Sequence, residues 1–169
     1  MSVIPVRSIF RTIFAAFQKV TDTFIRKNGI MDSSGQSIQK GNDHMPKIII
    51  TENAPKAIGP YSQAVKTGNL LFVSGQLPVN PKTGLFTSND IEGQTRQCLA
   101  NIAEIAKASG YVKEEIVKCT VYLQNLNDFA AMNVIYQEFF GLHKPSRVTV
   151  EVSRLPKDAL IEIDAVCGK

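Results

Sequence analysis

Hydrophobic positions after Met45 follow two different periods along the chain. Short apolar runs rich in β-branched residues predict strands, whereas apolar positions that recur every three or four residues predict two helices, each followed by a glycine. The predicted strands span 48–50, 64–67, 70–73 and 116–123, and the predicted helices span 91–106 and 129–140. Gly68-Asn69 predicts a two-residue hairpin turn, and Asn127 or Asp128 can cap the second helix. Two amphipathic helices on one face of a mixed β-sheet make an α+β fold.

The last part of the chain predicts two more strands joined by a tight connection, at 145–152 and 160–165. Because side chains alternate along a strand, Arg147, Thr149 and Glu151 face one way and the valines between them face the other. Glu162 lies inside the second of these strands, so that Arg147 and Glu162 could share one pocket as an anion holder and a base. From the spacing alone, an antiparallel ribbon that has a charged, wet face is the simpler interpretation.

The first 45 residues form a separate element in this interpretation. Residues 1–30 place apolar side chains at helical spacing and Lys or Arg on the opposite face, with no acidic residue before Asp22. Such a basic amphipathic segment is typical of an organelle-targeting leader, and an extra surface helix or a partner-binding helix are the alternatives. Residues 31–45 are small and polar and predict a linker, so the domain spans 46–169. We expect a mitochondrial location, with a plastid-type organelle or the cytoplasm as alternatives.

Charge is distributed unevenly along the 169 residues. The net charge is +4, but residues 46–169 hold 13 Lys or Arg and 12 Asp or Glu, which leaves an excess of only one positive charge. A protein that binds nucleic acid irrespective of sequence needs a clustered basic face, and none is visible after Met45. We therefore expect no nucleic-acid partner. The hydrophobic content of 44% is that of an ordinary globular chain with one core.

Three cysteines, Cys98, Cys119 and Cys167, lie far apart and form no metal-binding spacing. We expect free, buried, unreactive thiols, no metal site, no cofactor and no membrane span. His143, in the loop before Arg147, is positioned in sequence to approach the same pocket.

Four separated motifs resemble the reactive-intermediate deaminase family of the RidA type, also called YjgF-like. They are Ile58-Gly59-Pro60-Tyr61-Ser62-Gln63-Ala64, Val73-Ser74-Gly75-Gln76-Leu77-Pro78, Asn80-Pro81-Lys82-Thr83-Gly84, and Pro145-Ser146-Arg147 with Glu162-Ile163. The resemblance covers residues 46–168. It implies a chorismate-mutase-like fold, a homotrimer with sites between subunits, and hydrolysis of 2-imino acids, such as 2-iminobutanoate and 2-iminopropanoate, to 2-oxo acids and ammonia.

The chemistry of this reaction suits the two charged residues. The planar fork of Arg147 matches the carboxylate of a 2-imino acid, and Glu162 can orient and deprotonate the attacking water. The resemblance adds the lining of the pocket, which is Tyr61, Gly75, Phe129, Asn133 and Thr149. Thr149 departs from many bacterial members, which have cysteine at the matching position, so a thiol role is not expected here.

Two other classes of function stay open. Relatives have been assigned ribonuclease or translation-inhibiting activity, and others are described as chaperone-like or as binders of small ligands without turnover. A ribonuclease needs a catalytic histidine pair or a basic groove, which residues 46–169 do not supply. A non-catalytic binder needs the arginine but not the carboxylate.

Overall fold

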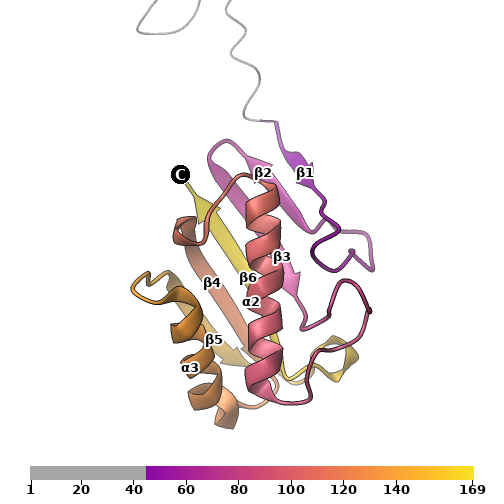
Figure 1. Cartoon of the computed structure of the whole chain (residues 1–169), viewed down its shortest axis with the longest axis vertical. Coiled ribbons are helices and arrows are strands. Elements are labelled where there is room, and N and C mark those ends of the chain that lie inside the picture. Colours follow the sequence, from indigo (N-terminus) through magenta and orange to yellow (C-terminus); the bar gives the residue numbers. More distant parts are fainter. Residues whose placement is uncertain (1–44) are drawn as a thin grey trace, which may run out of the picture. The chain divides into compact units, whose positions relative to one another are not determined.

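The computed structural model describes residues 45–169 and shows one mixed β-sheet with two helices on one face (Figure 1). The six strands are ordered β1-β2-β3-β6-β4-β5 in the sheet. The strands are β1 (Lys47–Ile49), β2 (Ala64–Thr67), β3 (Leu70–Gln76), β4 (Ile116–Leu123), β5 (Ser146–Glu151) and β6 (Ile161–Gly168). The helices are α2 (Ile91–Ala108) and α3 (Phe129–Phe140), and three short 3-10 turns are at Lys113–Glu115, Leu126–Asp128 and Pro156–Asp158. The α+β prediction is confirmed. The predictions for residues 1–30 and for almost all of the linker 31–45 concern positions outside the described residues.

The core lies between the sheet and the two helices. Odd-numbered residues of β6 point to the helices and are fully buried, whereas even-numbered ones are partly exposed on the opposite face. This alternation follows from the two-residue repeat of a strand. Leu99 and Ile102 of α2 and Met132 of α3 are also fully buried and cover the sheet. The helical periodicity of the sequence therefore predicts the covered face correctly.

The local turn predictions are mostly confirmed. Thr67 pairs with Leu70 across the hairpin, and Gly68 has a φ of 53°, a conformation that glycine adopts without strain. Gly141 ends α3 with a φ of 62°. Asp128 occupies the N-cap position of α3, but its side chain makes no capping hydrogen bond, so the expected side-chain cap is absent.

The order of the last strands differs from the sequence prediction. β5 pairs with β4 in parallel, and β6 pairs antiparallel with both β3 and β4. The strands of Arg147 and Glu162 are therefore not neighbours, because β4 lies between them. The physical reason is that β4, α3 and β5 form a β-α-β crossover, which joins parallel strands and places β5 at the outer edge of β4.

The sheet face opposite the helices carries several exposed apolar side chains on β3 and β5. Leu70 and Phe72 on β3 and Val148 on β5 are 43%, 46% and 48% exposed, and Val150 is exposed beside Val148. In the described part of the chain neither helix covers this face (Figure 1). Exposed apolar side chains on both sides of the polar β6 and β4 positions make this face a candidate interaction surface.

Residues 45–169 contain no helix with the length and apolar character needed to cross a membrane. Within the same range, no group of three or more His, Cys, Asp or Glu side chains is arranged to hold a metal ion.

Candidate active site

Arg147 leaves β5 on the helix side of the sheet and stacks on aromatic rings of α3. Its guanidinium carbon lies 4.5 Å from the ring centroid of Tyr136 and 5.6 Å from that of Phe129. Cation–π contacts of this kind hold a guanidinium in place without neutralising its charge. Among residues 45–169 no carboxylate lies within ion-pair distance of Arg147. The positive charge is positioned and free to bind an anion.

Two buried hydroxyl groups near Arg147 also lack partners. The Oγ1 of Thr149, on the same face of β5, and the hydroxyl of Tyr136 make no hydrogen bond to any described residue. Burial raises the pKa of Tyr136, and the neighbouring Cys119 thiol contributes, although its geometry falls short of a hydrogen bond. Buried polar groups in folded proteins are normally bonded, so unbonded hydroxyls around an unpaired arginine indicate that a polar partner outside the described chain completes them.

Asn133 belongs to the same cluster by its place on α3. It lies four residues after Phe129 and three before Tyr136, and helical residues at these spacings share one face. The structure thus brings together four predicted residues, Arg147, Thr149, Phe129 and Asn133. Tyr136 was not predicted as a site residue because its helical spacing assigned it only to the core, although its distance of seven positions from Phe129 was a usable signal.

Glu162 and Gly75 form a second cluster, on the face of the sheet without helices. Glu162 is half-buried on β6, and the register of β3 against β6 is interrupted between Val73 and Gln76, where Gly75 lies. A Cβ atom on Gly75 would collide with the Oε1 of Glu162. Glycine at this position leaves the space that the Glu162 carboxylate occupies, and a larger residue would displace that carboxylate.

The environment of Glu162 favours its protonated form. Burial raises the pKa of its carboxyl group, and the negative charge of Asp164 raises the pKa further. Asp164 accepts hydrogen bonds from the backbone N–H of Thr120 at 3.2 Å and from the hydroxyl of Tyr122 at 3.0 Å. A carboxyl group with a raised pKa can take up and return a proton closer to neutral pH. Asp164 was not predicted as a functional neighbour, although its position two residues after Glu162 places it on the same face.

Tyr61 shares a cavity with Gly75, a member of the second cluster. The cavity has a volume of ≈ 280 Å³ and is lined mainly by the segment before β2 and the loop after β3. Tyr61 is half-exposed at this cavity, and its hydroxyl accepts a long hydrogen bond of 3.5 Å from the backbone N–H of Ile58. It therefore belongs with Gly75 and Glu162 rather than with Arg147.

Arg147 and Glu162 point to opposite faces of the sheet in one chain. Arg147 is paired with Cys119, which faces the helices, whereas Glu162 is paired with Tyr122, which faces away from them. Two strand spacings, about 10 Å, also separate β5 from β6. The interpretation that the strands of Arg147 and Glu162 are neighbours is wrong, because β4 lies between them. Within one chain the two side chains do not meet, since the alternation along the strands directs them to opposite faces.

His143 and the cysteines do not join either cluster. The Nε2 of His143 lies 2.7 Å from the carbonyl oxygen of Ile116, so the ring ties the loop before β5 to the start of β4. Cys98, Cys119 and Cys167 are free and buried, as predicted. Burial raises the pKa of Cys119 to about 11 and of Cys167 to about 12, which keeps both thiols protonated and unreactive at neutral pH.

Comparison with known proteins agrees with this arrangement of motifs. The family model described as endoribonuclease L-PSP matches residues 51–168. The chain belongs to this family. A RutC family protein of Pyrococcus horikoshii is 59% identical over 74% of this chain and 99% of its own length. The 2-iminobutanoate/2-iminopropanoate deaminase of Escherichia coli is 52% identical over 72% of this chain and 97% of its own length.

Solved structures of the family share the fold. The crystal structure of the E. coli YjgF gene product is similar with a TM-score of 0.70 and 51% identity, over 73% of this chain and 98% of that one. The resemblance to the RidA type is therefore confirmed by sequence and by fold. The family description names an endoribonuclease and one close member is named a deaminase, so the geometry of the two clusters has to be weighed against both chemistries.

Proposed function

We propose that this protein is a hydrolase that converts reactive 2-imino acids and their enamine tautomers, such as 2-iminobutanoate and 2-iminopropanoate, to 2-oxo acids and ammonia. The 52% identity with the E. coli deaminase supports this reaction. The observation that carries it is Arg147, a positioned guanidinium that has no anionic partner among the described residues and lies beside two unbonded hydroxyls. A small carboxylate ligand with further polar atoms matches this set of donors.

Arg147 holds the carboxylate of the substrate in this proposal. Two parallel N–H groups of the guanidinium donate to the two carboxylate oxygens, which fixes the orientation of the adjacent C=N group. Thr149 and Asn133 supply further polar atoms at the same end, and Phe129 forms an apolar wall. The reaction needs no metal and no cofactor, because the protonated imine carbon is already electrophilic.

Glu162 moves the protons. Its carboxylate takes a proton from water as the water oxygen bonds to the carbon of the protonated imine, which gives a neutral carbinolamine. The protonated Glu162 then donates to the amino nitrogen, and the C–N bond breaks as the C=O bond forms. The Glu162 carboxylate takes the hydroxyl proton and passes it to the departing ammonia, which leaves as ammonium and restores the carboxylate. The products are the 2-oxo acid and an ammonium ion. General acid and base catalysis of this kind contributes about 10²- to 10⁴-fold.

We further propose a homotrimer in which each site is completed by two subunits. One subunit contributes Arg147 and its neighbours, and the next contributes Glu162, Gly75 and Tyr61. Two observations support this: the clusters lie on opposite faces of the sheet in one chain, and the face that carries Glu162 also carries exposed apolar side chains and is uncovered in the described part of the chain. Burying that face against a second copy would remove it from water.

The proposed reaction is tested by generating 2-iminobutanoate with a threonine dehydratase and trapping it with semicarbazide. The purified full-length chain is expected to divert the imine to 2-oxobutanoate and so to lower the yield of semicarbazone. A chain that carries both Arg147→Ala and Glu162→Gln serves as the inactive control. If a folded, oligomeric wild-type protein does not change the semicarbazone yield, the deaminase proposal is wrong.

Gly75→Ala is expected to lower kcat for 2-iminobutanoate by about a hundredfold, because the new Cβ displaces the Glu162 carboxylate that moves the protons. The displaced atom is the end of a flexible side chain, so the melting temperature should change little. Gly168→Ala is the matched control, since a Cβ at that position meets its nearest neighbour at 3.4 Å, an ordinary contact. If Gly75→Ala keeps the wild-type kcat, the assignment of Glu162 as the residue that transfers the protons is wrong.

Asp164→Asn is expected to shift the acidic limb of the kcat profile to lower pH. Glu162 acts as its carboxylate, so activity rises as pH increases through its pKa, which lies above the ordinary value of 4.5. The charge of Asp164 is one of the two causes of that increase, and its removal lowers the pKa of Glu162 while burial still keeps it raised. The measurement is kcat at each pH, with Asp158→Asn on the exposed surface as control. If the acidic limb of the kcat profile is unchanged in Asp164→Asn, the ionisation of Glu162 does not set that limb.

A ribonuclease is the second candidate, because the matching family carries that description. Incubation of the full-length chain with single-stranded RNA tests it, and we expect no cleavage above that of a chain carrying Arg147→Ala. A non-catalytic binder is distinguished in the semicarbazide assay, since it would bind 2-oxobutanoate without lowering the semicarbazone yield.

We propose a mitochondrial location, supported by the basic amphipathic pattern of residues 1–30. A fluorescent reporter fused after residue 45 is expected to enter mitochondria. A diffuse signal would support the cytoplasm, and a plastid signal in plant cells would support the other alternative.

A further inference from the structure

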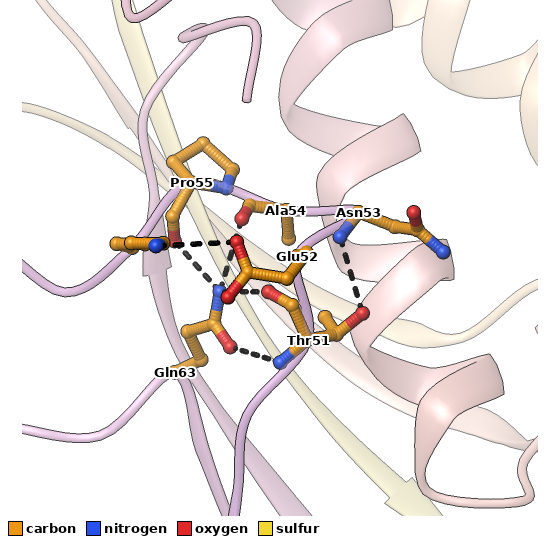
Figure 2. Close-up of polar contacts among 7 residues, drawn as sticks. Thr51, Glu52, Asn53, Ala54, Pro55 and Gln63 are labelled. Atoms are coloured by element: carbon orange, nitrogen blue, oxygen red, sulfur yellow. Dashed lines mark hydrogen bonds and ion pairs between the residues drawn. The ribbon is translucent and has the colours of Figure 1, made fainter. Parts of the chain in front are cut away.

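The side chain of Gln63 is buried, and both polar atoms of its amide group form hydrogen bonds to the backbone of the segment that precedes β2. Its Oε1 accepts from the backbone N–H of Thr51 at 2.7 Å, and its Nε2 donates to the carbonyl oxygens of Thr51, Ala54 and Pro55 at 3.0, 3.1 and 2.8 Å. Figure 2 shows Thr51–Pro55 curved around this one amide group. Gln63 is only 3% exposed, so its hydrogen bonds are shielded from water.

Gln63 is the main polar attachment of this segment. Among the described residues, every hydrogen bond that joins 51–60 to a residue beyond Tyr61 ends on Gln63. The remaining hydrogen bonds and the exposed ion pair of Glu52 with Lys56 stay within 51–61. Burial of Ala54 in the core is the second anchor. Without the amide, the segment would keep the burial of Ala54 and lose the hydrogen bonds that hold its backbone in place.

The same residue is also fixed to the strand that carries Gly75. The carbonyl oxygen of Gln63 accepts from the N–H of Ser74 at 3.0 Å, and the Ser74 hydroxyl donates to the carbonyl oxygen of Ser62 at 2.7 Å. Gln63 therefore lies between two walls of the ≈ 280 Å³ cavity. Residues of 52–61 form one wall, and residues of 75–84 form the other. A change in its side chain alters the position of one wall and leaves the other in place.

We infer that Gln63 is a positioning residue for the deaminase site, which fixes 51–61 so that Tyr61 faces the substrate beside Gly75. This inference rests on the proposed function. In this inference Gln63 acts through Tyr61, because its own amide group is already engaged with Thr51, Ala54 and Pro55. A glutamine is suited to this position because one amide supplies both an acceptor for a backbone N–H and two N–H donors for carbonyl oxygens.

Gln63→Met tests the inference, because methionine has a similar size and cannot make these hydrogen bonds. We expect KM for 2-iminobutanoate to rise by about tenfold with kcat nearly unchanged, since the pocket loses its fixed wall while Arg147 and Glu162 remain. Loss of folded protein would instead lower the apparent kcat and leave KM unchanged. Gln124→Met is the matched control, because its amide donates to the single carbonyl of Ser153 in an exposed loop.

The dependence on Tyr61 is measured in a double-substitution cycle. In a Tyr61→Phe background, Gln63→Met is expected to raise KM by much less than tenfold, because the residue through which it acts is already altered. An equal rise in both backgrounds would overturn the inference, as would a wild-type KM for Gln63→Met. If Gln63→Met does not fold, Gln63→Glu replaces it, since it keeps the acceptor for Thr51 and places an oxygen against the carbonyl groups of Ala54 and Pro55.

The wild-type control separates this inference from the proposed function. An inactive wild-type protein overturns the deaminase proposal and with it the role of Gln63 in that reaction. An active wild-type protein with unchanged kinetics in Gln63→Met overturns the inference alone. Hydrogen–deuterium exchange of 51–61 accompanies both measurements, and faster exchange in Gln63→Met than in wild type is the expected result.

Discussion

Replacing Arg147 with alanine is expected to lower kcat/KM for 2-iminobutanoate by roughly a hundred- to ten-thousand-fold, because two charge-assisted hydrogen bonds to the substrate carboxylate are lost. No other cation among the described residues stacks on Tyr136 and Phe129 to replace it. Binding of the stable product 2-oxobutanoate, measured by calorimetry, should be lost together with turnover. The expected loss is larger than for Gly75→Ala or Asp164→Asn, because Arg147 fixes the substrate before any proton moves.

Arg147→Lys separates the charge from the geometry. Lysine keeps a positive charge but presents a single ammonium group in place of a planar fork, so we expect an activity between those of wild type and Arg147→Ala. Arg154→Ala is the matched control, since Arg154 is exposed and pairs with Asp158 on the surface. If Arg147→Ala binds 2-oxobutanoate as tightly as wild type, the carboxylate is held elsewhere and the assignment of Arg147 is wrong.

The sequence predicts the faces of the strands better than the order of the strands. Alternation along 146–151 correctly places Arg147 and Thr149 together on one side, because the two-residue repeat is a local property. The neighbour of each strand is decided by non-local pairing, and the short connection before β6 suggested a ribbon that does not form. The order of the elements predicted from the sequence, a strand, then a helix, then a strand, nevertheless indicates that β4 and β5 form a parallel pair.

The site residues also divide into those whose proximity follows from local patterns and those whose proximity depends on non-local strand pairing. Arg147, Thr149, Phe129 and Asn133 are adjacent because one crossover holds β5 against α3, so their proximity follows from one supersecondary unit. Glu162 and Gly75 meet only because β6 inserts between β3 and β4, which local patterns do not specify. The electrostatic role of Asp164 and the attachment of 51–55 by Gln63 depend on tertiary distances, so neither was predicted from spacing.

Mixing two inactive chains is expected to restore activity if the site is shared between subunits. A chain with Arg147→Ala lacks the carboxylate holder, and a chain with Glu162→Gln should still bind 2-oxobutanoate but hydrolyse the imine slowly. In a cyclic trimer that contains both chains, one of the three interfaces brings an intact Arg147 together with an intact Glu162. Mixed trimers, isolated through two different affinity tags, should therefore recover about a third of the wild-type activity per trimer.

The recovery follows directly from the geometry of one chain. Arg147 and Glu162 point to opposite faces of one sheet, with β4 between their strands, so no rotation of either side chain brings them together within a subunit. The control combines the Arg147→Ala chain with a chain that carries both substitutions, which contains no intact Arg147 and should stay inactive. Mixed trimers without activity would show that the two residues do not serve one site across an interface, since each chain alone supplies only half of the required chemistry.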